Sequence, residues 1–181
     1  MYIFLTEEKS MQKFLDVLLA ARFPSGVGFK VIPHEGKGHL KQSIPIKLRV
    51  LNKSGVTFIV LIDQDSSDCL ALKNELDKLC RGTGANYKVR IVCRELEAWY
   101  LGDLSAVDKA FSTNLSKHAN RESFRDPDIL QDAKRVLKTY IGQIGQIETA
   151  ERIARAMVQS DFRENKSRSF HMFLKTVGLD R

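Results

Sequence analysis

The stretch VTFIVLIDQD, residues 56–65, combines a long apolar run with an abrupt acidic end. Seven apolar or β-branched residues in succession are typical of a central strand that is covered on both faces. Asp63 and Asp65 then stop the run. The stretch therefore predicts a buried strand in the middle of a sheet, with two carboxylates at its carboxyl end.

Three shorter apolar runs predict further strands, at residues 2–5, 29–32 and 87–93. Apolar residues three or four positions apart predict helices between the strands, at residues 10–22, 40–51 and 69–80, with Ser10 as the first N-cap. This alternation is typical of an open, mainly parallel sheet with crossover helices. Because such crossovers are right-handed, the carboxyl ends of the strands meet at one edge, where α/β proteins bind their ligands.

The second half of the chain predicts helices alone, joined by a polar loop at residues 114–127. These helices are expected at residues 94–100, 104–111, 129–141, 148–158 and 169–177. We expect residues 1–103 to form a Rossmann-like α/β core of about four strands with flanking helices. Residues 104–181 are expected to form a helical extension packed on that core, within a single compact unit.

The composition is that of a soluble globular protein, with 43% hydrophobic and 28% charged residues in a chain of 181. No apolar run approaches the ~20 residues that span a bilayer. Acidic Glu7 and Glu8 follow the apolar start of the chain, unlike the pattern of a signal peptide. We therefore expect a cytoplasmic protein with no membrane partner. Three cysteines without C-x-x-C spacing argue against a disulfide framework or a zinc site.

The formal net charge of +7 favours a polyanionic partner such as DNA or RNA, because Lys and Arg neutralise phosphates. A basic protein that binds no nucleic acid is the alternative. Two polar segments gather basic side chains: Lys37 and Lys41 lie in or beside a loop, and Lys166 and Arg168 precede a helix. Each segment suits a phosphate contact, or else forms a solvated loop or a capped turn.

Acidic side chains follow three of the four predicted strands. They are Glu7 after the first strand, Asp63 and Asp65 after the third, and Glu95 and Glu97 after the fourth. Carboxylates gathered at one edge of a sheet repel one another unless a cation compensates. Hard oxygen ligands select Mg²⁺ or Mn²⁺. The residues alone therefore predict an acidic metal site.

Structural roles are the alternative for these acids. An aspartate after a strand is often a turn former or a helix cap, as we expect for Asp68 before the third helix. Glu8 is expected in solvent, and Glu97 could face solvent on a helix. Trp99 is expected to pack in the core rather than to stack on a base. The sequence contains no Walker motif and no glycine-rich dinucleotide fingerprint.

An acid after the first strand and Asp-x-Asp after the third resemble the Toprim fold of topoisomerases, bacterial primases and overcoming-lysogenisation-defect nucleases. Two longer motifs, VLIDQDSSDC at residues 60–69 and RELEAWYLGD at residues 94–103, resemble domain-of-unknown-function family 4276. Residues 32–37, 124–128 and 165–170 are similar to other segments of that family. The resemblance covers nearly the whole chain.

The resemblance implies a Toprim-like fold and a Mg²⁺-dependent nuclease that acts on nucleic-acid phosphodiesters. It implies a prokaryotic role in phage defence or mobile-element control, with a partner ATPase of the ABC or AAA kind. The metal ligands carried over are Glu7, Asp63 and Asp65. Glu95 and Glu97 match the acidic pair of family 4276, as a second-metal ligand or general base.

Five basic residues are candidate phosphate contacts: Lys37, Lys41, Arg94, Lys166 and Arg168. The sequence departs from the Toprim pattern in two places, because Glu8 replaces a common glycine and Met11 stands where the nucleases carry another acid. A homo-oligomer is compatible with the sequence. The alternative function is a non-catalytic subunit that binds nucleic acid or an ATPase. Convergence of the Glu7, Asp63 and Asp65 carboxylates would favour the nuclease.

Overall fold

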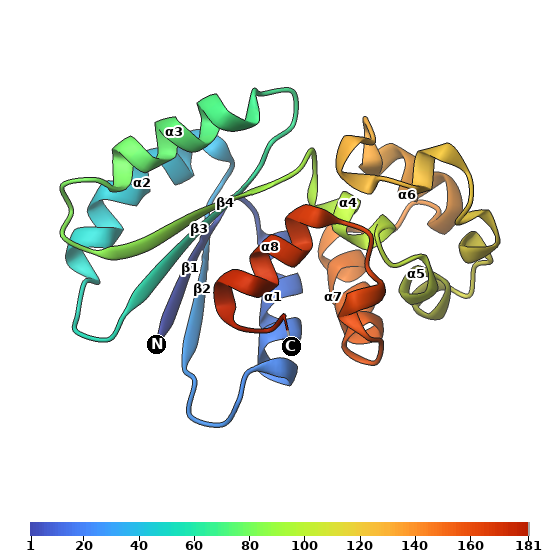
Figure 1. The fold of residues 1–181 in the computed structure, drawn as a ribbon, viewed down its shortest axis with the longest axis horizontal. Coiled ribbons are helices and arrows are strands. Elements are labelled where there is room, and N and C mark those ends of the chain that lie inside the picture. Colours follow the sequence, from blue (N-terminus) through green and yellow to red (C-terminus); the bar gives the residue numbers. More distant parts are fainter. Residues whose placement is uncertain (181) are drawn as a thin grey trace.

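The computed structural model describes residues 1–180 and shows an α/β fold with a four-stranded parallel sheet (Figure 1). The strands are β1 Tyr2–Thr6, β2 Phe29–Pro33, β3 Thr57–Asp63 and β4 Asn86–Val92. Their order is β2-β1-β3-β4, with every neighbouring pair parallel. The predicted fold class is therefore confirmed, and the strands lie where the apolar runs placed them.

Helices cover both faces of the sheet, which explains the unbroken apolar run in β3 (Figure 1). Helix α1, Lys9–Arg22, packs on the face that carries Ile59 and Leu61. Helices α2, Lys37–Val50, and α3, Cys69–Cys80, pack on the opposite face against Phe58, Val60 and Ile62. Because successive side chains of a strand point to opposite faces, a strand enclosed by two helical layers needs apolar residues throughout.

The second half of the chain forms helices that extend the layer of α1. They are α4 Leu96–Leu101, α5 Leu104–Phe111, α6 Ala133–Ile141, α7 Gln146–Val158 and α8 Arg168–Val177. Four 3₁₀ turns connect them, at Leu115–His118, Glu122–Phe124, Pro127–Ile129 and Phe162–Glu164. Helix α7 lies beside α1, and α8 packs against β4 (Figure 1). One apolar cluster thus joins the sheet, α1 and the C-terminal helices.

Trp99 is the centre of this joint cluster. Its ring is fully buried against Phe14, Phe170 and Phe173, and its Nε1–H donates to Ser169 Oγ at 2.8 Å. A tryptophan buried with its N–H satisfied supplies packing rather than a surface for a base. The expected packing role of Trp99 is therefore confirmed.

Several local predictions need correction. Helix α1 begins at Lys9 with Glu8 at its N-cap, so Ser10 is not the cap; its hydroxyl donates instead to Glu8 Oε2 at 3.3 Å. Helix α2 begins at Lys37, and Lys37 and Lys41 therefore lie on a helix rather than in a loop. Asp68 caps α3 as expected, because its Oδ1 accepts the Ala71 N–H at 2.7 Å.

The polar segment 114–127 also holds more structure than expected, since it contains two of the 3₁₀ turns. Helix α6 starts four residues later than predicted, because the Asp132 side chain caps it at Arg135 N–H. Cys69, Cys80 and Cys93 are all free thiols. Among residues 1–180, no helix has both the length and the apolar character needed to cross a bilayer.

Candidate metal centre

The acidic residues Glu7 and Asp63 lie at the carboxyl ends of the two central strands, β1 and β3. The chain leaves β1 toward β2 on one side, and it leaves β3 toward β4 on the other. Connections that diverge in this way open a crevice between the strand ends, which is where open α/β sheets place their ligands. The strand order therefore puts this pair of carboxylates at the site favoured by the topology.

Glu7 is buried, with 8% of its surface exposed, and its Oε2 accepts the Asp63 backbone N–H at 3.3 Å. Burial raises the pKa of Glu7 to about 7, against the opposing charge of Lys37 and the hydrogen bond from Asp63. A carboxylate in this position has lost the water that would stabilise its negative charge. A cation at the strand ends would supply the missing stabilisation.

Asp63 carries the clearest anomaly of the molecule. Its Oδ1 atom is buried and has no hydrogen-bond partner among the described residues. Burial, and then the negative charges of Glu7, Glu97 and Asp65, raise the pKa of Asp63 well above its usual range. Buried carboxylate oxygens are rarely left without a donor. An enclosed oxygen of this kind fits a cation ligand, and hard oxygen donors fit Mg²⁺ or Mn²⁺.

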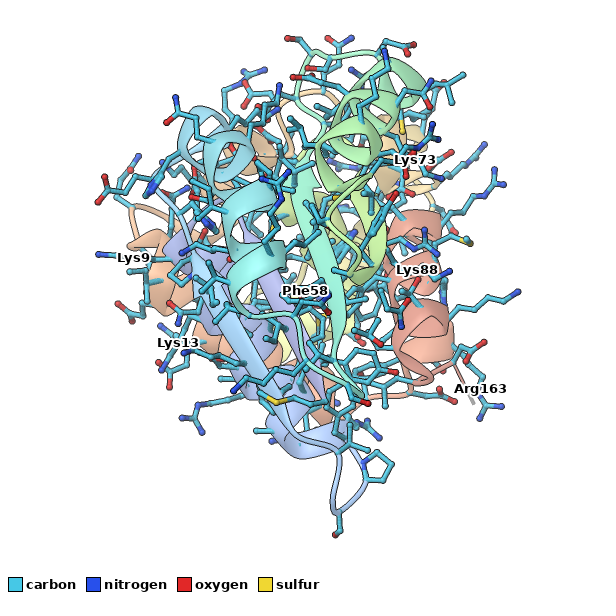
Figure 2. The ribbon with its side chains drawn as sticks, turned by 90° about the vertical axis from the view of Figure 1, so that its left-hand side faces the viewer. Lys9, Lys13, Phe58, Lys73, Lys88 and Arg163 are labelled. Carbon is cyan, nitrogen blue, oxygen red and sulfur yellow. The ribbon has the colours of Figure 1, made fainter. Side chains whose placement is uncertain are left out.

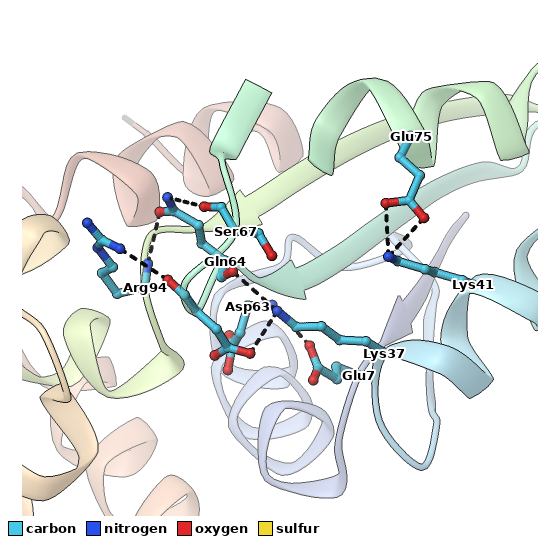
Figure 3. A network of polar contacts seen from close by, with 9 residues as sticks. Glu7, Lys37, Lys41, Asp63, Gln64, Ser67, Glu75 and Arg94 are labelled. Atoms are coloured by element: carbon cyan, nitrogen blue, oxygen red, sulfur yellow. Dashed lines mark hydrogen bonds and ion pairs between the residues drawn. The ribbon is translucent and has the colours of Figure 1, made fainter. Parts of the chain in front are cut away.

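Asp65 forms an ion pair with Lys37. Lys37 Nζ lies 2.7 Å from Asp65 Oδ2 and donates to the Gln64 carbonyl at 3.2 Å. Figure 3 shows Lys37 reaching from α2 to the loop after β3, beside Glu7 and Asp63. Asp65 stays close enough for its charge to raise the pKa of both Glu7 and Asp63. Lys37 is thus a positive charge already present within the acidic cluster.

The expected convergence of three carboxylates is therefore only partly seen. The structure brings Glu7 and Asp63 together, while Asp65 is engaged by the lysine. Within residues 1–180, no group of three His, Cys, Asp or Glu side chains is arranged to hold a metal ion. Glu7 and Asp63, with its unpartnered Oδ1, are therefore the two acids left to hold a cation.

Glu97 joins the cluster from the other side. It lies in the first turn of α4 and is partly buried rather than facing solvent. Burial raises the pKa of Glu97 to about 7, although Lys134 lies near enough to oppose the shift. The Tyr100 hydroxyl is also buried without a partner, and burial and then the charges of Glu97 and Asp63 raise its pKa far above the usual range. Asp63, Glu97 and Tyr100 thus form one enclosed polar group.

Glu95 has a different role from Glu97, although the sequence paired them. Its Oε2 accepts the backbone N–H of Lys134 at 2.9 Å, in the first turn of α6. The first N–H groups of a helix have no partner within the helix, and an acidic acceptor there is favourable. Glu95 therefore connects the sheet edge to the C-terminal helices.

The basic residues divide into two sets. Lys37 and Arg94 lie at the acidic cluster, and an Arg94 guanidinium N–H donates to the Asp65 carbonyl at 3.2 Å. Lys41 pairs instead with Glu75 on α3 at 2.9 Å (Figure 3). Lys166 donates to the Ala119 carbonyl at 3.1 Å, and Arg168 is exposed at the start of α8.

Two residues in the loops after β3 and β4 have unusual backbone conformations. Asp65 and Arg94 have φ values of 50° and 62°, in the left-handed region that favours glycine. The Asp65 N–H donates to the Arg94 carbonyl at 2.7 Å, so each residue holds the other in place. Strain of this kind tends to cluster at functional sites. Sequence reasoning found both residues but had no signal for their backbone geometry.

Three further polar residues near the strand ends do not belong to the site predicted from the sequence. Gln64 accepts from the Arg94 N–H at 3.3 Å and so ties the two loops together. Tyr100 resembled an ordinary apolar position in a helix. His34 donates through Nδ1 to the Thr6 carbonyl at 2.8 Å, which leaves its buried Nε2 without a partner. Gln64 could have been noticed from its place between two aspartates, whereas only tertiary packing reveals the other two.

The segments 94–103 and 165–170 form a structural network rather than a reactive one. Asn165 Nδ2 donates to the Trp99 carbonyl at 2.9 Å, and the Lys166 N–H donates to the Gly102 carbonyl at 3.0 Å. A Cβ on Gly102 would collide with the Asn165 side chain. This close approach explains a glycine at that position, and the network fixes α8 against α4.

The fold and this site define a parallel α/β protein with a partly uncompensated acidic cluster at its topological switch point. The chain belongs to the family described as domain of unknown function (DUF4276), whose model matches residues 6–178. Comparison with curated proteins and with solved structures gave no match.

Proposed function

We propose that this protein is a Mg²⁺- or Mn²⁺-dependent nuclease with a Toprim-like arrangement, acting on phosphodiester bonds of nucleic acid. The observation that carries the proposal is the buried Asp63 Oδ1, which has no hydrogen-bond partner in the part of the chain that the structure describes and lies beside Glu7 and Glu97. Acids brought together at the cost of raised pKa values are typical of functional sites. A protein with no use for a cation would gain stability by replacing Asp63.

Glu7 and Asp63 would hold the cation, with Asp65 as a third oxygen ligand. When bound, Mg²⁺ supplies charge for the phosphoryl oxygens and a more acidic water. Lys37 and Arg94 add fixed positive charge at the same edge, where a scissile phosphate would lie. Glu97 is suited to accept a proton, because its pKa of about 7 lies near the working pH of a general base.

The proposal extends, on the resemblance alone, to a cytoplasmic role in prokaryotic phage defence or mobile-element control with a partner ATPase. The formal net charge of +7 supports a nucleic-acid substrate, DNA or RNA, through phosphate neutralisation.

A non-catalytic subunit is the second candidate, and the Lys37–Asp65 ion pair is the observation that favours it. The ammonium group lies 2.7 Å from the carboxylate and already neutralises one of the three predicted ligands. A protein that uses this edge to bind nucleic acid or an ATPase would need no metal.

Cleavage assays separate the two candidates. Plasmid DNA and a structured RNA are incubated with the wild type, Asp63→Ala, Glu7→Ala and the control Glu75→Ala, with Mg²⁺ or Mn²⁺. Glu75 is an exposed acid paired with Lys41, away from the cluster. We expect the first two variants to cleave at least about 100-fold more slowly, since each removes a charge that acts on the transition state, and the control to cleave normally. Equal cleavage by the wild type and Asp63→Ala would rule out the nuclease proposal.

A further inference from the structure

A groove of about 490 Å³ lies at the outer edge of β4, between α3 and α8. Strand β4 is the last strand of the sheet, so one of its edges has no neighbouring strand. One wall comes from α3, with Cys69 and Lys73, and the other from the 3₁₀ turn Pro127–Ile129 and α8, with Ile129 and Arg168. The groove is thus built by the sheet core and the C-terminal helices together.

The groove is electropositive. Its basic side chains are Lys73, Arg90, Arg94 and Arg168. Lys73 and Arg168 are exposed on opposite walls, and neither takes part in a salt bridge between residues 1–180. In Figure 2, Lys73 and Lys88 lie on the side of the molecule where α8 is seen. The lining of the groove thus holds four basic side chains and two acidic ones, Asp126 and Asp128.

The two carboxylates in the groove are already occupied. Asp126 Oδ1 accepts the Asp128 N–H at 3.1 Å. Asp128 accepts from the Ser167 hydroxyl at 2.6 Å and from the Ser169 N–H at 2.7 Å. Neither acid forms a salt bridge with Lys73 or Arg168 among residues 1–180, and the four basic side chains of the groove outnumber its two carboxylates, so a positive excess remains for an anion.

Exposed apolar side chains lie next to the basic ones. Ile129 is 68% exposed and Met172 is 50% exposed, and both line the groove. Proteins bind single-stranded nucleic acids with a positively charged groove and aromatic side chains on which the bases stack. This groove is lined by the aliphatic Ile129 and the polarizable thioether of Met172 in place of aromatic rings, and both can contact the face of a base without reading its identity.

The groove also connects with the acidic cluster. Gln64 and Arg94 line it, and Gln64 in turn accepts from Lys37 while Arg94 donates to the Asp65 carbonyl. A chain bound in the groove would therefore pass from the edge of β4 to the strand ends that carry Glu7 and Asp63.

We propose that this groove binds a single strand of DNA or RNA next to the acidic cluster; the inference rests on the proposed function and deepens it. Lys73, Arg94 and Arg168 contact phosphates, and a base lies on Ile129 and Met172. A volume of about 490 Å³ is that of a site for one small ligand, so the groove itself takes a short part of one strand.

Fluorescence anisotropy tests the groove apart from cleavage. The full chain is titrated into labelled 12-nucleotide single strands, DNA and RNA, and into the matching duplex, in EDTA so that no cleavage occurs. The variants are Lys73→Ala/Arg168→Ala and Met172→Ala. The control, Arg49→Ala/Lys53→Ala, removes the same charge from exposed residues outside the groove. Circular dichroism melts verify that every variant folds.

We expect the wild type to bind single strands more tightly than the duplex. The Lys73/Arg168 variant should bind at least about tenfold more weakly, with a slope of log K against log salt that is shallower by about 1.4, because each lost phosphate contact on a single strand removes about 0.7. Met172→Ala should weaken binding several-fold with the slope unchanged, since it removes an uncharged contact. The control should bind like the wild type.

Three results would overturn the inference: equal binding by the groove variant and its control, duplex binding as tight as single-strand binding, or equal competition by a glutamate-rich peptide with no effect of Met172→Ala. The last would assign the groove to an acidic protein segment. Failure of the proposed function gives a different pattern. In that case Asp63→Ala cleaves like the wild type, while binding in EDTA still depends on Lys73 and Arg168.

Discussion

The acids at the switch point, Glu7 and Asp63, and two acids of the C-terminal half, Asp103 and Asp128, are all buried or half-buried, but only the second pair is surrounded by hydrogen-bond donors. Asp128 accepts from the Ser167 hydroxyl, the Ser169 N–H and the Ser169 hydroxyl at 2.6, 2.7 and 3.2 Å. Asp103, 5% exposed, accepts from a backbone N–H and two serine hydroxyls. Asp63 has a buried oxygen, Oδ1, with no hydrogen-bond partner among residues 1–180, although the Leu96 backbone N–H acts on the carboxyl group to lower its pKa.

The difference separates acids that stabilise the fold from acids whose burial is not compensated by donors. A carboxylate surrounded by N–H and O–H donors stabilises the structure around it, because each charge-assisted hydrogen bond compensates its burial. A carboxylate near other carboxylates destabilises the structure unless its charge is compensated. Glu95 follows a strand as Asp63 does, yet it accepts a helix N–H, so the donors at each oxygen distinguish the two kinds of acid and the position after a strand does not.

Stability measurements on variants of Asp128 and Asp63 test this difference between the two groups of acids, with the largest expected effect. Asp128→Ala leaves the donors of Ser167 and Ser169 without an acceptor, and we expect a loss of about 2–4 kcal/mol in the free energy of unfolding. Asp63→Asn removes a buried repulsion and should leave stability unchanged or raise it by about 1 kcal/mol. Urea unfolding in EDTA at pH 7.5 measures both. A loss of several kcal/mol in Asp63→Asn would mean that Asp63 is a structural acid.

The pH dependence of stability sharpens the comparison. The pKa values of Glu7 and Glu97 rise to about 7, so above their ordinary pKa of 4.5 the folded protein holds more protons than the unfolded chain. Stability from these groups is therefore present below pH 4.5 and is lost as the pH rises toward 7 and above. The loss is at most about 1.4 kcal/mol per pH unit for each group.

Thermal melts at pH 5.5 and 7.5 test this expectation against Glu7→Gln/Glu97→Gln, which cannot titrate at these positions. The difference between the two proteins removes contributions of opposite sign, such as that of His34, whose burial lowers its pKa. We expect the wild type to lose more stability on going to pH 7.5 than the variant does. Added Mg²⁺ should restore part of it at pH 7.5 only. An identical pH profile for both proteins would contradict the raised pKa values.

Lys37 offers a third test, because its Nζ lies 2.7 Å from Asp65 Oδ2 and its charge opposes the raised pKa of Glu7. Lys37→Met frees Asp65 and removes a charge that competes with a bound metal. We expect Mn²⁺ to bind about 5- to 10-fold more tightly, the effect of about 1–1.4 kcal/mol from one partly solvated charge. Lys41→Met is the matched control, since Lys41 neutralises Glu75 instead. Isothermal titration with Mn²⁺ measures both, and weaker binding by Lys37→Met would show that the lysine organises the site.

Much of the architecture could be predicted because its signals are local. The run at residues 56–62 is apolar or β-branched throughout because helices cover both faces of β3. Burial on both faces constrains every residue of the run, so it can be recognised in the sequence. The meeting of Glu7 with Asp63 also followed from a rule, namely that parallel strands share an edge. The four strands and the closeness of this pair were therefore accessible from sequence alone.

The partners of each acid could not be predicted, because they come from segments distant in sequence. Lys37 seemed to belong to a loop, yet α2 begins there and carries its ammonium group to Asp65. Glu95 and Glu97 looked equivalent, two positions apart. In the structure, Glu95 accepts a hydrogen bond from the α6 N-terminus, whereas Glu97 acts electrostatically on Asp63. The donor that faces each carboxylate oxygen is determined by how the helices pack, and the spacing of residues in the sequence does not predict that packing.

Substitutions of Glu95 have the smallest expected effect. They test whether Glu95 and Glu97 have different roles. Glu95→Ala removes the acceptor of the Lys134 N–H at the α6 N-terminus, which should cost about 1 kcal/mol of unfolding free energy. Glu95→Gln keeps an acceptor oxygen and should recover most of that loss. Neither change should alter Mn²⁺ affinity, whereas Glu97→Gln should weaken it, because Glu97 acts electrostatically on Asp63. If Glu95→Ala instead weakened Mn²⁺ binding as much as Glu97→Gln does, Glu95 and Glu97 would act as one acidic pair. The distinction between a structural role for Glu95 and an electrostatic role for Glu97 would then be wrong.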